Sequence, residues 1–101
     1  MAERAIVIDP RDSVAVAVAD LAAGEPCSVR VGDDVRTVEI RERIPFGHKF
    51  ALRRIPRGES VLKYGGVIGE ATAEIEPGAW VHVHNLVSRR GRGRAGEEGA
   101  G

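Results

Sequence analysis

Three short segments of the chain share one spacing rule that requires tight turns: an aliphatic residue, a glycine three positions later, and an apolar residue three positions after that. They are residues 21–27, 55–61 and 75–81, with glycines at positions 24, 58 and 78. Glycine tolerates the positive φ that many tight turns need, so each segment can anchor one aliphatic side chain, turn and begin a strand. The glycines are separated by 34 and then 20 residues, and this irregular spacing excludes a solenoid. We therefore expect a compact, strongly bent all-β fold.

Alternating apolar residues predict the strands themselves. The expected strands are residues 5–8, 14–18, 27–31, 35–40, 60–64, 67–73 and 80–86. Gly32-Asp33-Asp34 and Gly65-Gly66 are turn sequences between neighbouring strands, and they predict two hairpins. No window shows a convincing helical period, so we expect at most short helical turns, such as one over residues 20–23.

The composition limits the classes of protein to which the chain can belong. With 101 residues and 43% hydrophobic content, it is a single globular domain. The formal net charge is zero, which gives no general attraction to nucleic acid or to anionic membranes. A lone cysteine, Cys27, excludes an internal disulfide, and its apolar surroundings predict a buried structural thiol. There is no signal peptide and no apolar run of about 20 residues, so we expect a cytoplasmic protein.

The last residues differ in character from the rest. Residues 89–101 are rich in Arg and Gly and cannot bury enough apolar surface to offset the entropy lost on ordering. We expect a folded domain over residues 1–88 followed by a disordered tail. An Arg/Gly run can bind RNA, but a solvated terminus is the simpler interpretation.

All the imidazole of the chain lies in two places. His48 follows Phe46-Gly47, and His82 and His84 occur in Trp80-Val-His-Val-His-Asn85. If residues 80–86 form a strand, His82 and His84 share one face of it. The simple alternative is a half-exposed polar face opposite Val81 and Val83.

Three strings are specific enough to indicate a family. They are Ile44-Pro-Phe-Gly-His-Lys-Phe-Ala-Leu52, Lys63-Tyr-Gly-Gly-Val-Ile-Gly69 and Val81-His-Val-His-Asn85. Together with the repeats, they resemble the SAF domain of the altronate dehydratase family, which includes galactarate dehydratase and sulfolactate sulfo-lyase. The resemblance covers residues 10–88 and implies a β-clip fold.

The resemblance also implies a function. In this family the domain is either the N-terminal part of a long enzyme or a separate small subunit. The chain is then expected to be a small subunit or module of a sugar-acid dehydratase, acting with a large dehydratase subunit on an altronate- or galactarate-like acid. The alternatives are a sulfolactate sulfo-lyase small subunit and a carbohydrate-binding or assembly module without chemistry. Self-association into a homo-oligomer is also expected for so small a domain.

The expected site follows from the chemistry of water elimination. This reaction needs a base for the proton next to the carboxylate and an acid for the departing hydroxyl. The family implies a divalent metal, Fe²⁺ or Mn²⁺, as a Lewis acid. The expected metal ligands are His48, His82 and His84, and the expected catalytic residues are His48, Lys49 and His84.

Two of these residues also have a binding role, and each has an open alternative. Lys49 is expected to bind a substrate carboxylate, or else is simply solvated. Asn85 is expected to orient a substrate hydroxyl, or else to satisfy a turn. Tyr64 is expected to serve packing, and Trp80 to wall a pocket or fill a core end or subunit contact.

Overall fold

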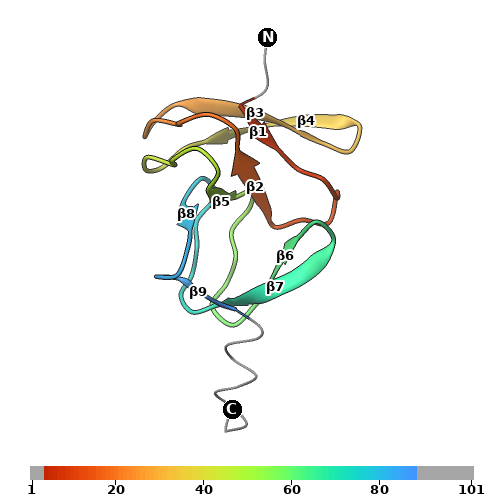
Figure 1. The fold of residues 1–101 in the computed structure, drawn as a ribbon, viewed down its shortest axis with the longest axis vertical. Helices are drawn as coiled ribbons and strands as arrows, with labels where there is room; N and C mark the ends of the chain where they lie inside the picture. Colours follow the sequence, from red (N-terminus) through yellow and green to blue (C-terminus); the bar gives the residue numbers. More distant parts are fainter. Residues whose placement is uncertain (1–3, 89–101) are drawn as a thin grey trace, which may run out of the picture.

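The computed structural model describes residues 4–88, and the expected Arg/Gly-rich tail lies outside them. The described chain is all-β, as expected, with nine short strands (Figure 1). They are β1 Ala5–Ile6, β2 Val14–Ala17, β3 Pro26–Val31, β4 Asp34–Glu39, β5 Lys49–Ala51, β6 Ser60–Lys63, β7 Gly66–Ala71, β8 Trp80–Val81 and β9 Leu86–Ser88.

The strands form three antiparallel groups. A four-stranded sheet in the order β1-β2-β5-β8 crosses the middle of the molecule. The β3-β4 hairpin lies at one end, and the β6-β7-β9 sheet at the other (Figure 1). The hairpin expected around residues 32–34 is confirmed, with Gly32 at a φ of 62°.

The spacing rule found in the sequence describes four turns, one more than expected. The fourth is residues 44–50, and all four glycines have nearly the same φ, between 84° and 88°. In each turn the residue after the glycine donates its N–H to the carbonyl three positions back, at 3.1–3.2 Å. A positive φ at the third position alone identifies type II turns. The turn glycines are Gly24, Gly47, Gly58 and Gly78.

Each turn is held by a segment that is distant in the sequence. The glycine N–H donates to the backbone carbonyl of one residue in another segment. The N–H of that same residue donates to the carbonyl of the residue after the glycine. The partners are Ile40 for Gly24, Ala17 for Gly47, Ala71 for Gly58 and Ala51 for Gly78. Isolated bridges Leu21↔Ile44 and Ile55↔Ile75 join the turns in pairs. The spacing rule therefore records one structural unit used four times.

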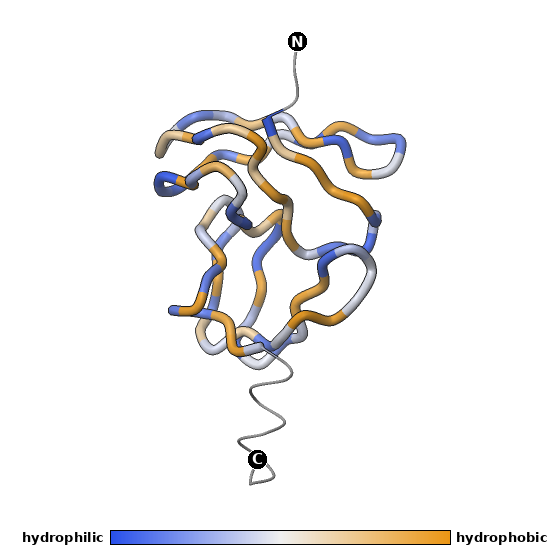
Figure 2. Tube along the Cα trace, viewed as in Figure 1, coloured by the Kyte–Doolittle hydropathy of each residue, from blue (hydrophilic) through white to orange (hydrophobic). Residues whose placement is uncertain are grey.

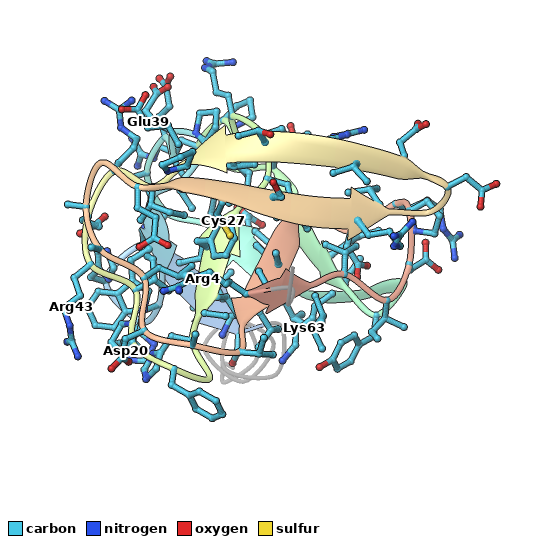
Figure 3. All side chains as sticks on the ribbon, turned by 90° about the horizontal axis from the view of Figure 1, so that it is seen from above. Arg4, Asp20, Cys27, Glu39, Arg43 and Lys63 are labelled. Carbon is cyan, nitrogen blue, oxygen red and sulfur yellow. The ribbon has the colours of Figure 1, made fainter. Side chains whose placement is uncertain are left out.

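The apolar residues that begin and end each turn segment pack into two hydrophobic clusters. Leu21, Ile44 and Phe50 lie in one cluster, which also holds Cys27. Ile55 and Ile75 lie in the second cluster, together with Val61 and Val81. Figure 2 shows the apolar segments running through the middle of the molecule, while polar residues gather at the tip of the β3-β4 hairpin. Cys27 is buried beneath that hairpin, as predicted (Figure 3), and burial raises the pKa of its thiol.

Two expectations about local structure are wrong. The described residues contain no helix, and the turn expected over residues 20–23 is absent because Leu21 uses its N–H and carbonyl to bridge Ile44. The strand expected over residues 80–86 ends at Val81. Residues 82–85 form a turn, and β9 begins at Leu86.

A third correction concerns the hairpin between β6 and β7. Its central residues are Tyr64 and Gly65, with φ values of 56° and 78°, one position earlier than Gly65-Gly66. Two successive positive φ angles define a type I′ turn, which rarely accepts a tyrosine. The carboxylate of the buried residue Asp12 holds the turn by accepting from Tyr64 N at 2.9 Å and Gly65 N at 2.8 Å.

Candidate functional site

Four aromatic rings converge where β5 and β8 lie side by side. The Trp80 ring stacks on His82, with centroids 5.0 Å apart and an interplanar angle of 8°. The His48 ring meets both edge-on, 5.4 Å from Trp80 and 5.2 Å from His82. His84 also contacts Trp80, at 5.7 Å. The structure thus brings together imidazoles from the two sequence motifs, and we call this group the ring cluster.

Backbone pairing explains why His48 reaches the other rings. His48 is the last residue of the second type II turn, and its carbonyl accepts the N–H of Ala17. The next two residues of β5 pair with β8, Lys49 opposite Val81 and Phe50 opposite Trp80. This register sets the start of β5 beside the end of β8, so His48 lies close to the turn that follows Val81.

Trp80 determines which tautomer the neutral His48 ring adopts. Its indole N–H donates to Nδ1 of His48 at 3.3 Å. Because an indole nitrogen can only donate, Nδ1 must be the unprotonated nitrogen, and the proton of the neutral ring lies on Nε2. His48 therefore presents an N–H donor at Nε2. No sequence pattern indicated this contact, because the two residues are 32 positions apart.

Asn85 holds His82 in place. Its Oδ1 accepts from the His82 N–H at 2.9 Å, and its Nδ2 donates to the Trp80 carbonyl at 2.8 Å. Asn85 is buried, and its backbone N–H donates to the His82 carbonyl at 3.0 Å. These three bonds hold the turn together, so Asn85 satisfies a turn, which was the second of the two roles considered for it. They also explain why residues 82–85 leave the strand conformation.

The groups that perturb the pKa of His82 electrostatically are all basic. Partial burial lowers the pKa of His82, and the nearby His48, Lys49 and His84 lower it further. The pKa of Lys49 is lowered first by burial and then by the charge of Lys63. His82 is consequently biased toward its neutral form, which can accept a proton.

Two residues contribute to this site in ways that the sequence did not predict. Trp80 packs against the first core cluster, and it also donates a hydrogen bond to an imidazole. Lys63, at the end of β6, is near enough to act on Lys49 electrostatically, and its Nζ lies 4.8 Å from the centre of the Tyr64 ring. In the sequence, Lys63 stood out only as the first residue of the family-specific segment Lys63–Gly69, which indicated no role for its side chain.

The expected metal can be tested against these donors. Within residues 4–88 there is no group of three or more His, Cys, Asp or Glu side chains placed to hold a metal ion. Nδ1 of His48 is already occupied by the indole, and the His82 ring is stacked on Trp80. The described residues alone do not form a metal cage.

Comparison with known proteins gives the family. The model of the altronate/galactarate dehydratase SAF domain matches residues 3–89, nearly the whole chain. The chain belongs to this family. It is 50% identical to altronate dehydratase of Escherichia coli K12 over 80 residues, which cover 79% of the chain and 15% of that enzyme.

A second relative has a different size. The (2R)-sulfolactate sulfo-lyase subunit alpha of Chromohalobacter salexigens is 39% identical over 88 residues, covering 84% of the chain and 94% of that subunit. Galactarate dehydratase (L-threo-forming) of Escherichia coli K12 is 38% identical over 82 residues, again with only 15% of the enzyme covered. The SAF domain thus corresponds to a small part of the two dehydratases and to nearly all of one lyase subunit. No helix among the described residues is long and apolar enough to cross a membrane.

Proposed function

We propose that this domain is the small component of a hydroxy-acid lyase of the altronate dehydratase type, and that it supplies the ring cluster to a site completed by a large subunit. The convergence of His48 and His82 beside Lys49 is the observation that supports this most strongly. A purely structural role does not require imidazoles from two distant segments to meet on the surface. Perturbed titratable groups gathered in one place are typical of functional sites.

The geometry suggests a role for each side chain. In a dehydration, the electron pair of the C–H bond next to the carboxylate forms a double bond as the neighbouring C–O bond breaks, and the hydroxyl leaves as water after taking a proton. His82, biased toward the neutral form, is the proposed base. The imidazolium formed when His82 takes the C–H proton then gives that proton to the departing hydroxyl. His48 holds this hydroxyl by a hydrogen bond from Nε2–H, and Lys49 attracts the substrate carboxylate as a point charge. His84 is exposed and remains a second candidate for acid–base work, and its catalytic role stays a prediction.

The need for a partner follows from exposed apolar side chains at the edge of the ring cluster. Phe46, two residues before His48, is 67% exposed, and Val83, between His82 and His84, is 81% exposed. Exposed apolar groups beside a functional site are typical of a surface that another protein covers. A large subunit seated there would exclude water and could add the missing ligands of a divalent metal such as Fe²⁺ or Mn²⁺. The metal, the substrate-binding role of Asn85 and homo-oligomer formation stay predictions.

A sulfo-lyase component is the second candidate. The match to nearly the full length of a sulfo-lyase subunit alpha favours it. Sulfite leaves a sulfonated hydroxy acid without needing a proton, so His82 would act only as the base in that reaction.

The test is reconstitution with the dehydratase-like large subunit of the same organism. We expect His82→Gln to lower kcat by about 100-fold or more, the usual contribution of a positioned base. His48→Ala should lower it by a similar factor, because it removes a hydrogen-bond donor to the leaving group. Arg36→Met, an exposed change on β4, is the control. Unchanged turnover in both histidine variants, with normal association of the subunits, would leave only a non-catalytic assembly module.

A further inference from the structure

The outer side of β4 is an unpaired strand edge. Among the described residues β4 pairs only with β3, and the six residue pairs of this hairpin follow one another without a bulge. Figure 3 shows β4, in yellow, on the outer side of β3. Proteins usually protect such an edge with a proline, a lysine, a bulge or a covering segment, because its free N–H and C=O groups can pair with another strand. Residues 34–39 contain no proline, lysine or bulge, and no described strand pairs with their outer side.

The hydrogen bonds of the hairpin determine which backbone groups of β4 point outward. Ile40, directly after the strand, donates its N–H to the carbonyl of Glu25 at 2.9 Å, so Ile40 faces β3. In an antiparallel ladder, the residues that bond to one neighbour alternate along the strand. Val35 and Thr37 lie at the intervening positions, and their N–H and C=O groups therefore point away from β3.

The free part of this edge is the half of β4 nearest the hairpin tip. Residues 34–37 are all exposed, Val35 at 61%, whereas Val38 is buried. Beyond it, the Glu39 carbonyl lies so close to Gly78 that a Cβ on this glycine would overlap it. The tip half thus extends past the body of the domain as a two-stranded ribbon. Such a ribbon is only marginally stable without a third strand.

The charges along this edge indicate which strand fits it. Asp34 and Arg36 flank Val35, and no ion pair within residues 4–88 uses either of them. If two copies pair antiparallel about Val35, Asp34 of each lies opposite Arg36 of the other, in the closely spaced positions that do not share hydrogen bonds. Pairing about Arg36 would place like charges opposite each other, and pairing about Thr37 would need the outward groups of Glu39, which are already covered. The edge is therefore complementary to itself in one register.

We propose that two copies of the chain join through β4 into one antiparallel sheet, in the order β3-β4-β4-β3, about a twofold axis at Val35. This inference does not depend on the proposed lyase function. The two bodies lie at the Glu39 ends of the paired strands, and antiparallel pairing carries these ends to opposite sides of the axis, where they do not collide. Only short edges meet, so the dimer is weak and reversible, and each contact occurs twice. In Figure 1 β4 lies apart from β5 and β8, so pairing leaves the ring cluster free.

Sedimentation equilibrium of the full chain tests this proposal. We expect a monomer–dimer equilibrium between micromolar and millimolar concentrations, in which amide exchange of Val35 slows as the concentration rises. Asp34→Arg and Arg36→Glu, both at exposed positions, each convert the two attractive charge pairs into repulsive ones. Each variant alone is expected to dimerise about tenfold more weakly or worse, whereas Arg57→Glu, a charge reversal at an exposed position outside β4, should not change dimerisation.

Mixing the two variants distinguishes self-pairing from other causes. One strand then carries two positive charges and the other carries two negative charges, so the mixture is expected to form a heterodimer at least as tight as the native dimer. A native chain that stays monomeric over this range overturns the inference, as do single variants that dimerise like the native chain. A mixture that stays monomeric also overturns it, because the edge would then be free for a strand of a different protein.

Discussion

Two glycines with the same backbone conformation should differ widely in their tolerance of alanine. Gly58 and Gly78 occupy the same position in equivalent type II turns, with φ values of 88° and 84°. A Cβ built on Gly58 meets no atom within 4 Å, whereas a Cβ on Gly78 would overlap the backbone carbonyl of Glu39. Gly58→Ala therefore isolates the conformational cost, and Gly78→Ala adds the clash.

The magnitudes follow from these contacts. The positive φ costs alanine about 1 kcal/mol at either position. At Gly78 the backbone cannot move away easily, because its N–H donates to Ala51 at 2.8 Å and its carbonyl accepts from Arg41 at 3.0 Å. Losing these two bonds costs about 1 kcal/mol each. We expect losses of about 1 kcal/mol for Gly58→Ala and about 3 kcal/mol for Gly78→Ala.

Urea denaturation followed by the fluorescence of the single tryptophan, Trp80, measures both losses. For a domain of this size, 1 kcal/mol corresponds to a fall in Tm of about 4–8 °C, so thermal unfolding gives an independent estimate. Equal losses for the two variants would refute the reasoning, because they would show that the close approach of Glu39 has no energetic effect.

Two other predictions concern charged groups. Because the folded state lowers the pKa of His82 below its ordinary 6.5, the unfolded chain binds more protons, and stability is fully present above about pH 6.5 and lost as the pH falls below it. His82→Asn should flatten the dependence of the free energy of unfolding between pH 7 and pH 5, and an unchanged profile would contradict this. Asp12→Ala should lower the free energy of unfolding by about 3 kcal/mol, because it leaves the N–H groups of Tyr64 and Gly65 without their acceptor. Asp12→Asn, which keeps one acceptor oxygen, should lose less, and a loss no larger than that of the exposed Asp33→Ala would disprove the bracing role.

The sequence predicted the turns better than it predicted the site. The spacing of apolar residue and glycine identified three turns, and the same rule applied to Ile44, Gly47 and Phe50 would have found the fourth. The alternating residues from Trp80 to Leu86 resemble a strand, but the Asn85 side chain satisfies the local backbone and ends it. Competition between side chain and backbone of this kind is not visible in an apolar pattern.

Contacts within the site depend on register, which a single sequence does not reveal. That His48 lies beside His82 depends on the pairing of β5 with β8, and the indole bond to His48 depends on the same pairing. The electrostatic effect of Lys63 on the pKa of Lys49 depends on the packing of separate sheets. The residue types were visible in the sequence, but their neighbours became known only from the fold.

The hydrogen bonds that hold each type II turn to a distant segment have a consequence for the order of folding. The turn at Gly78 closes on Ala51, and β8 follows it directly, so the indole reaches His48 only after segments about 30 residues apart have docked. Domains stabilised by such non-local pairings fold slowly, on a scale of about milliseconds to seconds. A ribosome-bound fragment ending before residue 80 would contain His48 and both lysines but no indole to orient the imidazole. The His48 ring therefore gains its indole partner only after β5 and β8 have paired.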